Sequence, residues 1–219
     1  MKTSRMAACV LGVVTLVSAA MAQVGDPVTP IDGHEAGKNA KARESGAPAS
    51  ATIGGFPSQW FYYGNQPAKR ADIDKLTGKP APELKPAASL HGKAQHIATE
   101  GKIIVVDFWA TWCPPCLKSI PGNNELEKKY KDKDVALVSI CTANGQDQLS
   151  KVIQEHGIEY PVSKDAGDKM AKAWHVSFYP TYAVVDKKGI VRAIGLAPDA
   201  AGMVVDKLLQ ETADAQKQP

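Results

Sequence analysis

Residues 109–116 read Trp-Ala-Thr-Trp-Cys-Pro-Pro-Cys, so two cysteines are separated by two prolines. An apolar run at residues 103–108 comes before this stretch, and a helical pattern of apolar residues follows it. The order predicts a dithiol at the N-terminus of a helix that follows a buried strand. At that position, unpaired backbone N–H groups and the helix dipole favour a thiolate over a thiol. The pattern therefore predicts thiol–disulfide exchange.

The two cysteines have different predicted roles. Cys113 is expected at the exposed start of the helix, where its thiolate would act as the nucleophile. Cys116 comes about one turn later and faces further inward, so it could resolve a mixed disulfide and release the substrate. Pro114 and Pro115 suit a first helical turn, because their fixed φ is compatible with the helix and no N–H is lost there.

A purely structural disulfide and a zinc half-site are the alternatives for this pair. A two-residue loop constrains the unfolded chain little, so such a disulfide stabilises the fold weakly. The chain has no second close cysteine pair, and Leu117 follows Cys116 where haem attachment requires a histidine. Redox chemistry is therefore favoured. We expect no metal and no cofactor, and the redox centre would be a Cys113–Cys116 disulfide.

The first 22 residues have the pattern of an export signal. Lys2 and Arg5 form a basic start, and the mostly apolar run at residues 6–21 ends near small residues, Ala20 and Ala22. The run is shorter than the roughly 20 apolar residues of a membrane span. An uncleaved segment that tethers the protein to the membrane is the alternative. Export predicts a periplasmic or other extracytoplasmic location, which is an oxidising compartment.

The composition is that of a globular protein, with 219 residues, 44% hydrophobic and 22% charged. Loss of residues 1–22 would remove Lys2 and Arg5 and no acidic residue, so the net charge would fall from +3 to +1. A nearly neutral protein has no bulk electrostatic attraction for nucleic acid, and we expect no such partner. We also expect a monomer.

The remaining chain divides into a leader, a domain and a tail. Residues 23–77 are predicted to form a flexible leader that contains an aromatic segment at 56–63. Residues 78–213 are predicted to form the domain, and residues 214–219 a tail. Large rings such as Trp60 and Phe61 are costly to leave in water, so packing of this segment on the domain is favoured over a docking patch for a partner.

Strands and helices alternate within the predicted domain. Strands are expected at residues 103–108, 135–141, 160–162, 181–186 and 190–195. Helices are expected at residues 115–130, 147–156 and 165–175, and from residue 199 onward. This order predicts an α/β sandwich with a mixed sheet.

Residues 106–116 resemble the active-site segment of the thioredoxin superfamily. The Cys-Pro-Pro-Cys form, the export signal and the long stretch between Cys116 and Pro180 resemble its TlpA/ResA-like extracytoplasmic branch. The resemblance implies a thioredoxin-like fold, with a mixed central sheet flanked by helices after an N-terminal extension. It implies disulfides of proteins as substrates and a reductant kept reduced by a membrane-linked electron donor. Cytochrome c maturation is a typical task of that branch.

Tyr179-Pro180-Thr181 resembles the loop whose cis proline faces the disulfide in this superfamily. The resemblance implies that the backbone of Tyr179 pairs with an extended substrate segment beside Cys113. A trans proline before a strand is the alternative. Trp112 either flanks the substrate groove or covers the edge of the sheet.

Asp107 interrupts an apolar strand, where desolvation should raise its pKa. The resemblance implies that this carboxylate accepts the proton of Cys116. A satisfied buried polar group is the alternative. Many thioredoxins pair this acid with a lysine on the next strand, and the predicted strand from residue 135 contains none. The carboxyl should then be more strongly perturbed, or its role should differ.

Two other functions are open. A peroxide reductase on this fold would carry Thr or Ser three residues before the reactive cysteine, where this chain has Ala110. A Cu(I)-binding or Cu(I)-delivery module would use the two thiolates with a histidine, but no histidine is placed by spacing. Cys141 has the pattern of a small buried residue rather than a regulatory thiol.

Overall fold

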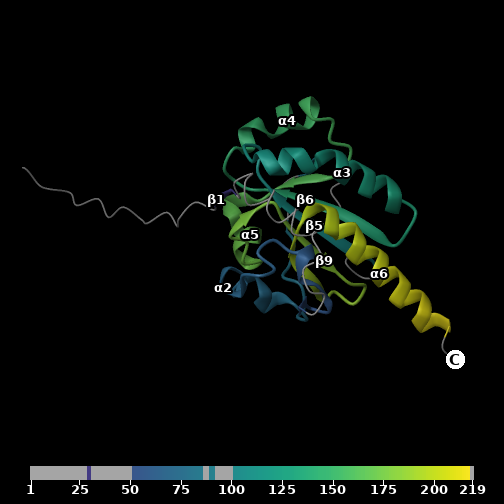
Figure 1. The fold of residues 1–219 in the computed structure, drawn as a ribbon. Helices are drawn as coiled ribbons and strands as arrows, with labels where there is room; N and C mark the ends of the chain where they lie inside the picture. The colour runs from purple at the N-terminus through teal and green to yellow at the C-terminus, as the bar shows by residue number, and fades with distance from the viewer. Residues whose placement is uncertain (1–28, 31–50, 86–88, 92–100, 218–219) are drawn as a thin grey trace, which may run out of the picture.

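The computed structural model describes residues 29–30, 51–85, 89–91 and 101–217 (Figure 1). Its centre is a six-stranded sheet in the order β10-β9-β5-β6-β7-β4. These strands are β4 Ser89–His91, β5 Ile103–Trp109, β6 Val135–Cys141, β7 Val162–Lys164, β9 Thr181–Val185 and β10 Val191–Leu196. β5, β6 and β7 run parallel, and β4, β9 and β10 are antiparallel to their neighbours, which confirms the predicted mixed sheet.

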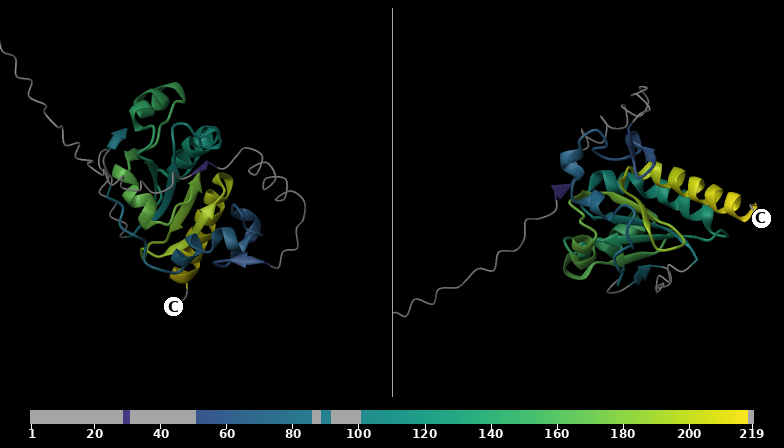
Figure 2. Two further views of the ribbon diagram at one scale, coloured as in Figure 1. Left: turned by 90° about the vertical axis from the view of Figure 1, so that its left-hand side faces the viewer. Right: turned by 90° about the horizontal axis from the view of Figure 1, so that it is seen from below.

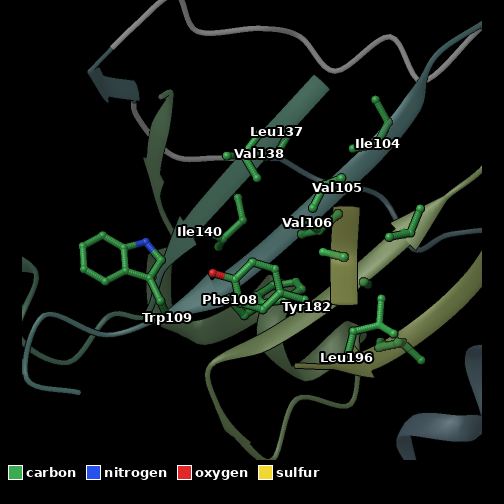
Figure 3. Close-up of a cluster of buried hydrophobic side chains, with 14 of the residues drawn as sticks. Ile104, Val105, Val106, Phe108, Trp109, Leu137, Val138, Ile140, Tyr182 and Leu196 are labelled. Carbon is green, nitrogen blue, oxygen red and sulfur yellow. The ribbon is translucent and has the colours of Figure 1, made fainter. Parts of the chain in front are cut away.

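β5 lies at the middle of this sheet and is buried along its whole length. A strand covered on both faces needs apolar residues at successive positions, and the Ile-Ile-Val-Val run at its start provides them. Figure 3 shows Val105, Val106 and Phe108 near Ile140 of β6 and Tyr182 of β9. The core therefore lies on both sides of the strand that leads into the two cysteines.

Four α-helices cover the sheet: α3 Pro114–Tyr130, α4 Leu149–Glu155, α5 Lys169–Ala173 and α6 Pro198–Lys217. α3 and α6 pack together, and the Tyr130 hydroxyl donates to the carbonyl of Gly202 at 3.0 Å (Figure 1). Asp107 contacts α3, whereas the next residue, Phe108, contacts Trp174 at the end of α5. Successive residues of a strand face opposite sides, so α3 and α5 cover opposite faces of the sheet (Figure 2). Within the described ranges, no helix is long and apolar enough to cross a membrane.

Two predicted elements differ from the structure near β7. The strand begins at Val162 instead of residue 160, because Pro161 before it has no N–H to donate to a neighbouring strand. The helix predicted at residues 165–175 is limited to α5, since Gly167 and Asp168 adopt positive φ and break the helical path. The Asp165 carboxylate then accepts the backbone N–H groups at the start of α5. β4 and the short strand β8, Phe178–Tyr179, were not predicted.

Residues 51–77 pack against the domain instead of forming a flexible leader. This segment contains β2 Thr52–Ile53, β3 Phe56–Pro57, the 3-10 turns η1 Ser58–Trp60 and η2 Ile73–Leu76, and the short helix α2 Pro67–Arg70. Phe56, Phe61 and Tyr62 are buried, so the aromatic segment joins the core as expected. The packed region therefore starts before Gly78. The predicted export signal and residues 31–50 of the leader lie outside the described residues.

A buried arginine attaches this segment to the sheet. Arg70 is 0% exposed, and its guanidinium donates to the carbonyls of Tyr62 at 2.9 Å and Ile194 at 2.8 Å. It also forms an ion pair with Asp74. A Cβ added at Gly195 would lie 2.7 Å from Arg70 Nη1, so only glycine leaves room for the guanidinium there. Arg70 thereby supplies hydrogen-bond donors to backbone carbonyls that would lack partners at the edge of the sheet.

Arg70→Met should lower the free energy of unfolding by about 3 kcal/mol, because buried carbonyls and Asp74 would lose their donor. Urea denaturation measures this loss. Arg192→Met is the matched control: Arg192 forms ion pairs with Asp186 and Glu211 at the surface, and its removal should cost less than about 1 kcal/mol. Equal losses in the two variants would contradict the role assigned to Arg70.

Candidate active site

The two cysteines form a disulfide at the N-terminus of α3. Their Cα atoms lie 5.3 Å apart, and Cys113 is the N-cap residue of this 17-residue helix. The backbone N–H of Cys116 donates to Sγ of Cys113 at 3.3 Å. Pro114 and Pro115 occupy the first helical turn, as predicted. In the reduced protein, this N–H and the positive end of the helix would stabilise a thiolate on Cys113.

The prediction that Cys113 is exposed is wrong for this disulfide-bonded state. Cys113 is 0% exposed and Cys116 is 2% exposed. The disulfide turns the sulfur of Cys113 back toward the helix, and the ring of Trp112 beside it packs edge-on against Tyr179 at 6.2 Å. Access of a protein substrate to Cys113 therefore requires local movement.

The turn before the cysteines is held by the loop that follows β6. The Thr111 hydroxyl donates to the carbonyl of Gly145 at 2.9 Å, and Nε1 of Trp112 donates to the carbonyl of Asn144 at 3.2 Å. Gly145 has a φ of 81°, and a Cβ there would lie 2.5 Å from the Thr111 hydroxyl oxygen. Trp112 is half-buried and is oriented by these contacts. The local sequence pattern did not predict a role for Thr111 or Gly145.

The loop between β8 and β9 carries the predicted proline. The Tyr179–Pro180 peptide bond is cis, as the resemblance implied. Tyr179 is buried and contacts Trp112, so the structure brings this loop to the cysteine turn. Thr181 is fully buried, and its hydroxyl donates to the carbonyl of Phe178 at 2.6 Å. Its side chain thus fixes the loop and is not placed to contact a substrate.

β8 is paired with a strand from the N-terminal part of the chain. β1, Thr29–Pro30, runs parallel to β8, with Thr29 opposite Phe178 and Pro30 opposite Tyr179 (Figure 1). This is the backbone position at which the resemblance placed an extended substrate segment. The sequence contained no signal for the pairing, because two residues are too few to show a period.

Asp107 is 2% exposed and lies in a neutral hydrogen-bond network. Its Oδ2 accepts from Nδ2 of Asn123 at 3.1 Å and from the hydroxyl of Ser139 at 3.2 Å. Ser139 lies directly opposite Asp107 on β6. It is therefore on the strand where many thioredoxins carry a lysine that pairs with this acid. Burial raises the pKa of Asp107 to about 7, and the hydrogen bonds from Ser139 and Asn123, together with the nearby Tyr182 hydroxyl, oppose this rise.

Further polar residues of the network were not predicted. The Tyr182 hydroxyl lies 3.0 Å from Oδ1 of Asn123 and 3.1 Å from Oγ of Ser119. Nδ2 of Asn123 also lies 3.4 Å from the hydroxyl of Tyr160. Asn123 follows Cys116 by seven residues, a spacing that returns to the same helix face. This polar residue on an otherwise apolar face was a signal that could have been used.

The third cysteine of the described chain is separate from this chemistry. Cys141 is fully buried with a free thiol, and burial raises its pKa to about 12. It therefore fits the predicted small buried residue. Among the described residues, no cluster of three or more His, Cys, Asp or Glu side chains could hold a metal ion.

Comparisons with known proteins agree with this geometry. A family model described as Redoxin matches residues 76–210. "Thiol-disulfide oxidoreductase ResA" of Bacillus thuringiensis is 34% identical over 123 residues, which are 55% of this chain and 70% of that protein. "Thioredoxin-like protein YneN" of Bacillus subtilis is 28% identical over 137 residues, covering 62% and 79% of the two chains.

Solved structures with the same fold are also similar. A putative thiol:disulfide interchange protein DsbE from Chlorobium tepidum matches with a TM-score of 0.52 and 26% identity, over 61% of this chain and 96% of that one. The thioredoxin domain of a thiol-disulfide oxidoreductase from Bacteroides vulgatus has a TM-score of 0.54 at 24% identity, over 60% and 96% of the chains. The second likeness concerns the fold alone.

Gly145→Ala should slow disulfide exchange with a protein substrate by about tenfold, because the new Cβ would displace Thr111 and Trp112 beside the nucleophile. Gly157→Ala is the matched control. Gly157 also has positive φ, but an added Cβ there meets no atom within 4 Å. Both variants should lose about 1 kcal/mol of stability from backbone strain. An unchanged exchange rate in Gly145→Ala would contradict this role of the loop.

Proposed function

We propose that this chain, which belongs to the Redoxin family and is a ResA-like protein thiol–disulfide oxidoreductase, is exported and acts as a reductant through Cys113 and Cys116. The observation that supports this proposal most directly is the disulfide at the start of α3, where the N–H of Cys116 donates to Sγ of Cys113. The cis-proline loop lies beside it through the contact between Trp112 and Tyr179.

The proposed reaction begins with the reduced protein. The Cys113 thiolate attacks one sulfur of a substrate disulfide, and the other substrate sulfur leaves as a thiolate that takes up a proton. The thiol of Cys116 then gives its proton to Asp107 and attacks Sγ of Cys113. The substrate sulfur bonded to Cys113 leaves as a thiolate that takes up a proton, and the Cys113–Cys116 disulfide forms. Two electrons pass to the substrate, and a membrane-linked dithiol donor would return them.

The surrounding groups have separate tasks in this proposal. The N-terminal end of α3 stabilises the Cys113 thiolate, both when it attacks the substrate and when it leaves. The backbone of Tyr179 pairs with an extended segment of the substrate, and the ring of Trp112 flanks that segment. The redox centre is the cysteine pair itself. Disulfides of exported proteins, including haem-site cysteines in cytochrome c maturation, are the proposed substrates.

Cys116→Ser should accumulate mixed disulfides through Cys113, because no thiol remains to resolve them. Affinity purification from cells, followed by non-reducing electrophoresis, measures the adducts. Cys141→Ser keeps the active pair and serves as the control that should accumulate none. Cys113→Ser/Cys116→Ser should also accumulate none. Absence of adducts in Cys116→Ser would contradict the proposed function.

The direction of transfer is tested by the reduction potential of the Cys113–Cys116 couple in glutathione buffers. A reductant should have a potential near or below that of thioredoxin, about −270 mV. A value near −120 mV, typical of strong oxidants, would overturn the reductant assignment and leave the exchange chemistry intact.

The pairing of β1 with β8 gives the substrate a competitor at Tyr179. Deletion of residues 27–32, which include β1, should raise the rate of protein disulfide reduction about fivefold, since one or two backbone hydrogen bonds would no longer have to break. Deletion of residues 44–49 is the control, because it removes the same length of leader and also one acidic residue. Stopped-flow kinetics measures both rates, and equal rates would show that β1 does not compete.

A further inference from the structure

Among the residues that the structure describes, no positively charged side chain pairs with the Asp107 carboxylate. The groups that hydrogen-bond to it, Asn123 from α3 and Ser139 from β6, are neutral. Both of these hydrogen bonds reach Oδ2, and within the described part of the chain Oδ1 has no hydrogen-bond partner. A buried carboxylate without a cation is costly to ionise, and the neutral donors are then what makes ionisation accessible.

The orientation of Asn123 is set by Tyr182. The Tyr182 hydroxyl donates to Oδ1 of Asn123 at 3.0 Å, so the NH₂ end of the amide faces Oδ2 of Asp107. The opposite orientation would place the amide oxygen against a carboxylate and would leave the tyrosine hydroxyl without this acceptor. Asn123 is itself buried, so water does not replace either contact easily.

The same hydroxyl also lies close to the turn that carries the resolving cysteine. Tyr182 lies 3.1 Å from Oγ of Ser119, and Ser119 donates to the carbonyl of Cys116 at 2.7 Å. Ser119 and Asn123 also line a groove between α3 and α6.

We propose that Asn123, oriented by Tyr182, is a positioning residue that stabilises ionised Asp107 and thereby allows this carboxylate to take the proton of Cys116 at neutral pH. The proposal rests on the proposed function, in which Cys116 resolves the mixed disulfide. In this proposal, the side-chain amide of Asn123 and the phenol of Tyr182 stabilise the carboxylate in place of a positively charged side chain.

The titratable groups that face Asp107 do not compete with it near neutral pH. Tyr160, Tyr182 and Cys141 interact with Asp107 electrostatically. Burial raises the pKa of Cys141 to about 12 and that of each tyrosine above its usual range. All three are therefore neutral where Asp107 titrates. Since the hydrogen bond from Asn123 lowers the pKa of Asp107, its removal should raise that pKa and leave less carboxylate at neutral pH.

The test measures the rate at which Cys116 resolves a preformed mixed disulfide, between about pH 5 and pH 9. Asn123→Leu should move the midpoint of this profile up by about one pH unit, which slows the step up to about tenfold below that midpoint. Tyr182→Phe should move it in the same direction by less. Asp107→Asn should abolish the midpoint.

Asn124→Leu is the matched control, because Asn124 lies on the same helix and its side chain bonds to the backbone groups of Gly157 and Glu159, outside the Asp107 network. Its profile should match the wild type. If Asn123→Leu does not fold, Tyr182→Phe and infrared titration of the Asp107 carboxyl decide the question. A midpoint unchanged in every folded network variant would overturn the role of Asn123. Failure of Cys116→Ser to trap adducts would instead contradict the proposed function.

Discussion

The structure depends on burial of β5 on both faces of the sheet. Its neighbours β6 and β9 pair with it along nearly its whole length, so its carboxyl end has a fixed position. Three segments meet at that end: the cysteine turn, the loop after β6 that contains Gly145, and the cis-proline loop. Reactive groups at the carboxyl ends of strands can thus be held by a rigid core while remaining on loops.

The same strand brings a carboxyl group into that core. The neighbours of Asp107 on β5, Val106 and Phe108, face the other side of the sheet, and the Asp107 side chain turns toward α3. An apolar surrounding would keep this group protonated at neutral pH, whereas a cationic partner would keep it ionised. The neutral donors give an intermediate result, with a pKa of about 7, which suits a group that accepts and releases a proton at each turnover.

Elements were predicted correctly where the physical cause of the local sequence pattern also determines the final structure. The apolar run of β5, the prolines at the start of α3 and the strands β9 and β10 were all predicted, because each reflects a backbone preference or burial over a few residues. Arg70, Asn123 and Gly145 were missed. Each depends on a distant partner: Thr111 lies 34 residues from Gly145, Tyr182 lies 59 residues from Asn123, and Gly195 lies 125 residues from Arg70.

The sequence alone determined the mixed α/β fold and the position of the dithiol at a helix N-terminus, since periodicity and proline chemistry act over short distances. It also determined that Asp107 would be perturbed, because a carboxyl in an apolar strand is desolvated in any fold that buries the strand. Only the tertiary structure decided which groups stabilise that carboxyl, how deeply Cys113 is covered and that β1 pairs with β8. Those outcomes depend on which distant segments meet, and hydrogen-bond geometry between them leaves no periodic trace in the chain.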